Sequence, residues 1–302
     1  MTDSDNRICF AIQAHHEPKM CERLVRVLCS EGDAVILHVN KKEKDYRKDV
    51  VGRLKDVEGL YVIPIEESVP VNWSGFSQVR ATLVLLNYFL RLPAGYRWFS
   101  FHSGQDYPIK PIGQYRKFLS EHDPNMLVEV DSNPMLWRCR LYNFFRENPH
   151  NRTFLLANLD KLLRNIQKPF IRRNKNIDFK RGSNWFTANR ETGKKLLSAL
   201  SREWQAVWKY TAVPDEHYFQ TLSHMLGIPV TPDNYRYVLW RSNRSSPENL
   251  REEHLGALLD SHCFFARKFT YEHREILDLL DIAAGRNAGP RRAFDMELAA
   301  LA

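Results

Sequence analysis

The sequence lacks the short motifs that mark the commonest nucleotide sites and esterases. Its 302 residues contain no Gly-x-Gly-x-x-Gly and no Gly-x-x-x-x-Gly-Lys-Ser/Thr, which argues against a standard dinucleotide or P-loop site. A Gly-x-Ser-x-Gly nucleophile elbow is also missing. The only Asp-x-Asp tripeptide is Asp3-Ser4-Asp5 at the polar N-terminus, so the body of the chain has no such pair to hold a divalent cation against a diphosphate.

Cysteines and long apolar runs are also scarce. The five cysteines are odd in number and match no zinc spacing, which favours free thiols in a reducing compartment. No run approaches the ~18 apolar residues that span a bilayer, and Met1–Arg7 has no apolar signal core. We therefore expect a cytoplasmic protein, with a peripheral position at the inner membrane face left open. The net charge of +8 fits nucleic acid, an anionic membrane or a phosphorylated substrate without choosing among them.

Short apolar runs alternate with segments of helical periodicity, the pattern of βαβ units. The predicted strands are Ile8–Ala14, Ala34–Val39, Leu60–Ile65, Trp98–His102, Met126–Val130 and Tyr235–Trp240. The predicted helices are Met20–Cys29, Ser77–Leu92, Ile112–Ser120, Phe154–Ile166, Glu191–Leu200, Glu216–Met225, Leu255–Ser261 and His273–Ile282. We expect an α/β fold with a mostly parallel sheet in one domain, 1–284. The stretch Pro134–Arg181 should be largely irregular, and 285–302 a mobile tail.

Polar clusters follow three of the predicted strands: His15-His16, Asn40-Lys41-Lys42 and Ser103–Asp106. Ligands bind at the carboxyl ends of strands in open α/β sheets, so these clusters predict a binding crevice, although each could be an ordinary solvated loop. Glu129-Val130-Asp131 is a weaker metal candidate, with both carboxylates on one face of a strand. His15 and His16 should point apart, which makes them poor joint ligands.

Without a metal, a diphosphate leaving group requires cationic side chains. The late part of the chain supplies Arg236, Arg241, Arg244, Arg267 and Lys268. Lys268 follows Phe264-Phe265-Ala266 closely and precedes Phe269, a context that favours a directed cation over a snorkelling surface lysine.

Two further motifs suggest a site with a base. Gly182-Ser183-Asn184-Trp185-Phe186 is a place where backbone approaches a ligand closely. Pro214-Asp215-Glu216 begins a predicted helix, which places Glu216 at the positive end of the helix dipole. Such acidic residues are also good helix caps. The functional alternative is that Glu216 serves as a general base.

Seven such elements, in this order, resemble the core-2/I-branching β-1,6-N-acetylglucosaminyltransferase and peptide O-xylosyltransferase family, glycosyltransferase family 14, in a bacterial-type form. They are Ile8–His16 with Pro18, His38–Lys42, Trp73-Ser74-Gly75 with Ser77 and Val79, Ser103–Ile109, Gly182–Phe186, Pro214–Glu216 with Phe219 and Thr221, and Phe265–Phe269. The resemblance runs from about Ile8 to Ile282.

The resemblance implies a GT-A-like fold and a metal-independent, inverting transfer from a UDP-sugar, with GlcNAc or xylose as the sugar. It assigns Glu216 as the base that deprotonates an acceptor hydroxyl, with Asp215 nearby, and Lys268 as a diphosphate contact. The upstream cation is one of Arg236, Arg241 and Arg244. Ala14, Asn40, Trp73 and Asp106 are expected on the donor side, and Gly182, Ser183 and Trp185 near donor and acceptor.

The chain departs from the family pattern at Asn40, where aspartate is usual, which leaves the uridine contacts open. It has few of the many cysteines of animal members, and we expect it to lack their N-terminal anchor. The expected acceptor is a glycan or glycolipid of bacterial surface-polysaccharide synthesis, and the basic stretch Ile171–Arg181 a membrane or phosphate contact. The alternatives are an inactive sugar-binding relative, or a basic nucleic-acid-binding protein, for which no known motif is present.

Overall fold

The computed structural model describes residues 6–171, 173–241 and 246–286, and its main feature is a seven-stranded sheet. The strands lie in the order β3-β2-β1-β4-β7-β6-β8. β1 pairs in parallel with β2 and β4, β2 with β3, and β6 with β8, whereas β7 runs antiparallel to β4 and β6. The α/β class with a mostly parallel sheet is therefore confirmed. The bounds are β1 Arg7–Ala14, β2 Ala34–Val39, β3 Leu60–Val62, β4 Tyr96–Ser103, β6 Met126–Val128, β7 Phe186–Asn189 and β8 Val230–Thr231.

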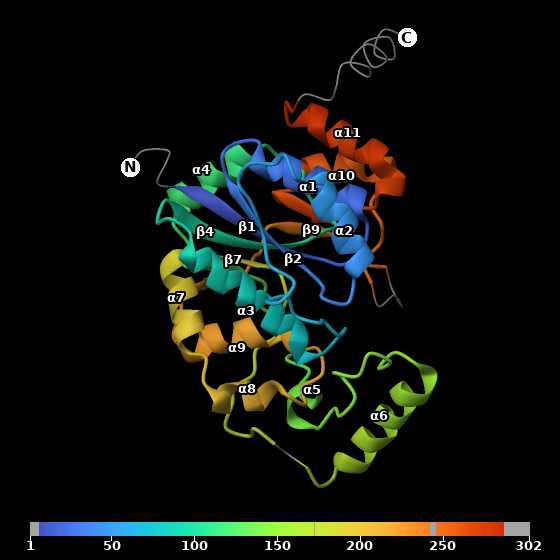
Figure 1. The fold of residues 1–302 in the computed structure, drawn as a ribbon. Helices are drawn as coiled ribbons and strands as arrows, with labels where there is room; N and C mark the ends of the chain where they lie inside the picture. Colours follow the sequence, from blue (N-terminus) through green and yellow to red (C-terminus); the bar gives the residue numbers. More distant parts are fainter. Residues whose placement is uncertain (1–5, 172, 242–245, 287–302) are drawn as a thin grey trace.

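Alternation along β1 divides the core into two layers, one on each face of the sheet. Ile8, Phe10 and Ile12 pack with α1 (Pro18–Cys29), α4 (Ile112–His122) and α11 (Arg274–Ala283). Cys9 and Ala11 pack with α3 (Phe76–Arg91), α7 (Arg190–Ser198) and α9 (Tyr218–Met225). These helices cover the two faces in Figure 1. A strand buried on both faces reads as the continuous apolar run seen in the sequence.

A second sheet of three short strands lies beyond the first, and the sequence analysis did not predict it. β10 (Phe265–Arg267) pairs antiparallel with β5 (Asp106–Pro108) and in parallel with β9 (Arg236–Val238). The pairing sets Arg267 opposite Asp106. This sheet brings the late cationic motif to the end of β4, 160 residues earlier in the chain.

Several local predictions need correction. The helices α2 (Lys44–Arg53) and α8 (Arg202–Trp208) and the strand β7 were missed, and the strand expected over Leu60–Ile65 ends at Val62. Within Pro134–Arg181, the expected helix is α6 (Phe154–Gln167), and a single turn, α5 (Trp137–Arg140), precedes it. The remaining helix is α10 (Leu255–Asp260). Of the predicted tail, Arg286 is held by Asp281 (2.8 Å), and 287–302 lie outside the described residues.

Arg190 closes the carboxyl end of α3, the long helix on which part of the site is built. Its guanidinium donates to the backbone carbonyls of Leu90 (2.7 Å), Leu92 (2.6 Å) and Tyr96 (3.1 Å). The last carbonyls of a helix have no partner within the helix, so a planar cation with several donors suits this position.

We predict that Arg190→Ala lowers the free energy of unfolding by about 2–3 kcal/mol, because it removes several charge-assisted hydrogen bonds at once. Arg190→Lys should recover only part of this loss, since one ammonium cannot span the same carbonyls. Urea unfolding followed by circular dichroism measures the change. Lys194→Ala, at an exposed ion pair on α7, is the matched control. Equal stability of all variants would contradict the capping role.

Candidate functional site

The carboxyl ends of β1, β2 and β4 meet at one edge of the sheet, where the sequence predicted a crevice. Asn40 N–H donates to the carbonyl of Ala14 (3.0 Å), which joins the ends of β1 and β2. A methyl group built on Gly104 would lie 3.1 Å from Cβ of Ala14, so the turn between β4 and β5 also packs there. The buried carboxylate of Asp106 accepts from the hydroxyl (2.5 Å) and backbone N–H (3.2 Å) of Ser103.

Asn40 holds the loop that carries Trp73. Its Oδ1 accepts from the backbone N–H of Val71 (3.0 Å), and the Nζ of Lys42 donates to the carbonyl of Val71 (3.1 Å). Trp73 is 51% exposed, with the guanidinium of Arg152 5.1 Å from its ring centroid. The side chain of Asn40 therefore holds the loop by contacts with its backbone, and the ring of Trp73 remains exposed beside it.

Gln78 on α3 connects this loop to the Pro-Asp-Glu turn. It accepts from Ser74 N–H through Oε1 (2.6 Å) and donates through Nε2 to Oδ2 of Asp215 (3.2 Å). Val213 N–H donates to the Ser74 carbonyl (3.0 Å) as a second link. Gln78 was not among the predicted site residues, although it lies within the element Trp73–Val79 that carried the resemblance.

Glu216 lies in a separate 3-10 turn, Pro214–Glu216, and α9 begins only at Tyr218. The single helix expected over Glu216–Met225 is thus wrong, because His217 adopts φ −127° and breaks the helical path. The side chain of Glu216 is 37% exposed, and its Oε2 accepts from Nη1 of Arg138 (2.6 Å). Arg138 was missed, since it lies in a stretch without clear periodicity.

The Gly-Ser-Asn-Trp-Phe segment runs beside this turn. Gly182 N–H donates to the carbonyl of Glu216 (2.9 Å), and Nε2 of Gln220 donates to the Ser183 carbonyl (2.6 Å). A methyl group on Gly182 would lie 1.7 Å from the carbonyl oxygen of Glu129, so only glycine fits without a backbone shift. The sequence predicted that the backbone at Gly182 approaches a ligand closely. In the structure it closely approaches the backbone of Glu129.

Trp185 connects the Gly182–Phe186 segment with Arg267, which precedes Lys268 in the chain. The guanidinium of Arg267 lies 4.4 Å from the Trp185 ring centroid, and its Nε is 3.6 Å from Oδ1 of Asp106. Burial and the neighbouring charge of Arg267 lower the pKa of Lys268, against an opposing effect of Glu17. A nearby anion would offset the effect of Arg267 on Lys268. Arg267 was a candidate from the sequence, but not the arginine expected at the diphosphate.

The three arginines expected at the diphosphate differ in their positions. Arg236 is buried, and its Nη2 donates to the Phe101 carbonyl (2.5 Å) with Nε2 of His102 3.3 Å away. Arg241 lies at the surface in an ion pair with Glu248. Arg244 lies outside the described residues.

His15 and His16 are in contact, contrary to the expectation that they point apart. Their ring centroids are 4.3 Å apart with the rings nearly perpendicular, because both residues lie beyond the end of β1, where strand alternation no longer applies. Burial, His16 and Lys268, in that order, lower the pKa of His15 to about 4. Lys268 is among the charges that lower the pKa of His16 as well.

The remaining acidic candidates do not assemble into a metal centre. Glu129 and Asp131 follow the end of β6, and Asp131 pairs with Nη2 of Arg181 (2.5 Å). Among the residues described, no group of three or more His, Cys, Asp or Glu side chains is arranged to hold a metal ion. Asp3 and Asp5 are outside those ranges.

These contacts form a continuous circuit around the sheet edge. It passes from Ala14 through Asn40, the loop of Trp73, Gln78, Asp215 and Glu216 to Gly182, Trp185, Arg267 and Lys268, by hydrogen bonds, one cation–ring contact and neighbours in the chain. Predicted residues from six separate elements are therefore linked at this edge of the sheet.

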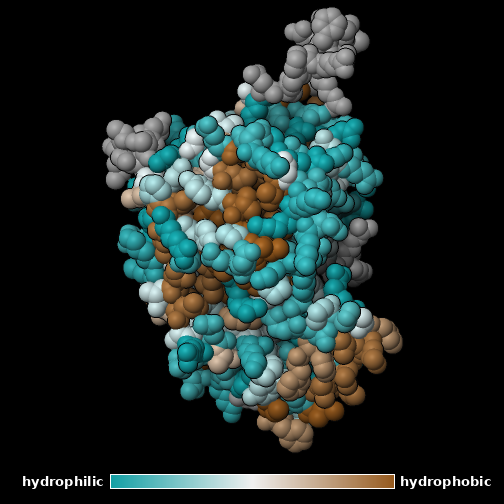
Figure 2. Space-filling view, in the orientation of Figure 1, coloured by the Kyte–Doolittle hydropathy of each residue, from teal (hydrophilic) through white to brown (hydrophobic). Residues whose placement is uncertain are grey.

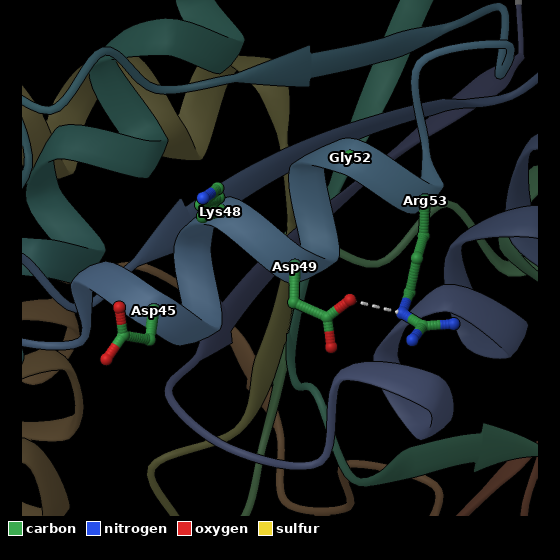
Figure 3. Close-up of a pocket in the computed structure, with 5 residues that line it drawn as sticks. All are labelled: Asp45, Lys48, Asp49, Gly52 and Arg53. Atoms are coloured by element: carbon green, nitrogen blue, oxygen red, sulfur yellow. Dashed lines mark hydrogen bonds and ion pairs between the residues drawn. The ribbon is translucent and has the colours of Figure 1, made fainter.

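A separate hollow is unrelated to this circuit. Figure 3 shows its lining residues, Asp45, Lys48, Asp49, Gly52 and Arg53, and all five belong to α2. Asp49 and Arg53 already form an ion pair at 2.7 Å. Side chains from one face of a single helix give no convergent set of ligand-binding groups.

The fold and the site define an α/β protein whose sheet edge carries a linked set of polar residues, with the Glu216 carboxylate, Arg267 and Lys268 among them. A family model for the Core-2/I-branching enzymes matches residues 8–259, and the chain belongs to this family. This membership and the sheet together bear out the GT-A-like class.

Two similar curated proteins are transferases by name. The human beta-1,3-galactosyl-O-glycosyl-glycoprotein beta-1,6-N-acetylglucosaminyltransferase is 28% identical over 239 residues, which are 77% of this chain and 52% of that protein. The mouse protein of the same name with the suffix 4 is 24% identical over 231 residues, 75% of this chain and 49% of its own. The chain thus spans about half the length of these relatives. Among solved structures, mouse xyloside xylosyltransferase 1 aligns with a TM-score of 0.38 and 12% identity, over 86% of this chain and 97% of that one.

Burial and the adjacent charge of Glu216 raise the pKa of Asp215 to about 7. The unfolded residue loses its proton near pH 4, so between pH 4 and 7 the folded protein holds one more proton. The raised pKa of Asp215 therefore adds to the free energy of unfolding in full below pH 4, and this addition is lost as the pH rises to 7.

We predict that the free energy of unfolding of the wild type falls by up to about 4 kcal/mol between pH 4 and 7 because of Asp215. Asp215→Asn should remove this decline. Thermal unfolding across this range compares the variant with the wild type. Asp260→Asn, at an exposed position on α10, should leave the profile unchanged. Parallel profiles for Asp215→Asn and wild type would show that Asp215 is ionised throughout.

Proposed function

We propose that the protein is a glycosyltransferase that moves a sugar from a UDP-sugar to a hydroxyl group of a glycan or glycolipid, with inversion to a β-linkage. The observation that carries the proposal is the circuit of contacts that joins Glu216 to Arg267 and Lys268 at one edge of the sheet. Family membership supports the reaction class, and the names of the relatives favour GlcNAc as the donor sugar. Xylose is the second candidate, from the sequence resemblance.

Glu216 is the proposed general base. Its partly exposed carboxylate is accessible to an acceptor hydroxyl, and the bond from Arg138 to Oε2 fixes its orientation. The acceptor oxygen then attacks the anomeric carbon from the face opposite the diphosphate. Asp215 is buried behind Glu216 and bound by Gln78, so its proposed role is to position the turn.

Lys268 and Arg267 are the proposed partners of the departing diphosphate. Burial lowers the pKa of both side chains, the charge of Arg267 lowers that of Lys268 further, and an incoming anion would offset these effects. Arg267 is pre-positioned by Trp185 and Asp106, as electrostatic catalysis requires. Arg236 is bound within the protein by the Phe101 carbonyl and is not assigned to the diphosphate. The donor base and ribose would lie by Ala14, Asn40 and Trp73.

The reaction is proposed to need no metal, because these cations are placed to neutralise the charge that a divalent ion would otherwise meet. Transfer should therefore be unchanged in EDTA. A radiolabelled sugar-transfer assay with and without chelator measures this. Loss of activity in EDTA with recovery in manganese would contradict the metal-free mechanism.

We predict that Glu216→Gln lowers kcat by about 10²–10⁴-fold, because the amide cannot accept the acceptor proton. Thermal stabilisation by UDP should persist, since the substitution leaves the cationic side of the crevice intact. Glu121→Gln, at an exposed ion pair on α4, is the matched control and should retain full activity. Wild-type turnover by Glu216→Gln would remove this residue from the base role.

A further inference from the structure

The helix α6 carries its apolar residues on the outside. Figure 1 shows it at the lower right, apart from the layers that cover the sheet, and Figure 2 shows a hydrophobic surface at the same place. Its outward stripe consists of Leu155 (74% exposed), Leu159 (38%), Leu162 (56%) and Ile166 (57%), and Phe154 (87%) and Phe170 (82%) extend it at the two ends. The stripe recurs at three- and four-residue spacing, as one face of a helix requires.

The inward face of the same helix is polar. Its two buried residues are Asp160 and Gln167. Asp160 accepts from Nη2 of Arg146 (2.7 Å) and Nη1 of Arg164 (3.2 Å), and Gln167 exchanges hydrogen bonds with the backbone N–H (2.8 Å) and carbonyl (3.0 Å) of Tyr142. The helix is therefore attached to the protein by its polar side. An exposed stripe of large apolar residues on this scale marks a binding surface.

The segment that contains the stripe is basic in sequence. Residues 148–177 contain seven Lys and Arg side chains and a single acidic one, Asp160. The charge of Asp160 is already balanced by two arginines on the inner side. Lys161 and Lys168 lie at exposed positions beside the stripe. Two copies of the protein packed stripe to stripe would bring these positive charges together, whereas an anionic lipid surface would complement them.

We propose that α6 is an interfacial helix that docks the protein on an anionic membrane. Phe and Leu on one face with Lys at its border is the composition of helices that lie in the headgroup layer. At 14 residues α6 is too short to cross a bilayer, and within the described ranges no helix is both long and apolar enough to do so.

The basic stretch Ile171–Arg181, which the sequence suggested for this contact, is bound within the protein where it is described. Arg173 donates to the Cys139 (2.9 Å) and Val207 (2.7 Å) carbonyls, and Arg181 pairs with Asp131. The docking surface is instead the preceding helix. Arg152, at its N-terminal approach, also contacts Trp73, so the membrane would lie on the side of the crevice that carries this tryptophan.

Co-sedimentation of the full chain with vesicles tests the proposal. Wild type should bind vesicles of phosphatidylcholine with roughly one-third phosphatidylglycerol at least about tenfold more tightly than vesicles of phosphatidylcholine alone. Leu155→Gln/Leu162→Gln and Lys161→Glu/Lys168→Glu should each lower binding to the anionic vesicles by about tenfold or more. Leu259→Gln, at a 43% exposed leucine on α10, is the matched control and should bind as wild type. Glu216→Gln should also bind as wild type, so the docking is tested independently of the proposed transfer.

Three results would overturn the proposal. The first is that wild type does not bind vesicles but forms dimers in light scattering, and that Leu155→Gln/Leu162→Gln abolishes these dimers. This result would assign the stripe to contact with a second copy. The second is binding that depends on the lysines but not on the leucines, which would indicate a soluble polyanion. The third is equal binding by wild type and both double variants.

Discussion

The hydrogen bond from Gly182 N–H to the Glu216 carbonyl is the contact on which the arrangement of the site depends. It joins the segment that enters β7 to the turn that carries the carboxylate, and the Glu129 backbone closes the third side. A side chain at position 182 would push these three segments apart. Because glycine removes this constraint, the turn can lie against the sheet edge with Glu216 still accessible.

The surrounding polar groups are held by partners drawn from several elements. Gln78 uses both ends of its amide to bind the Trp73 loop and Asp215, and Asp106 faces Arg267 across the small second sheet. Buried polar groups without such partners would cost several kcal/mol each. The same contacts keep charges in place before any ligand arrives, which is the condition for electrostatic stabilisation of a transition state.

The segment from Trp137 to Arg146 connects the crevice with α6. Arg138 binds Glu216, the guanidinium of Arg164 on α6 lies 4.6 Å from the Trp137 ring centroid, and Arg146 bridges Ser74 and Asp160. The stretch without clear periodicity in the sequence therefore carries both a partner of the proposed base and the attachment of the proposed membrane helix. Its order comes from these polar contacts, which leave no periodic pattern.

The sequence by itself determined the strands at the core of the sheet, most of the helices and the polar ends that meet at one edge, because burial on two faces leaves long apolar runs such as Ile8–Ala14. The ordered motifs also led to the family, and with it to Glu216 and Lys268 as candidates. Only the tertiary structure decided that Arg138 and Gln78 reach the turn and that Arg267 lies against Trp185 while Arg236 is buried in the protein. These are pairings between distant residues, and strand registers such as Arg267 opposite Asp106 are set by packing that no local window contains. The outward direction of the apolar face of α6 is of the same kind: periodicity predicts the helix, but the buried contacts of Asp160 and Gln167 decide which side faces solvent.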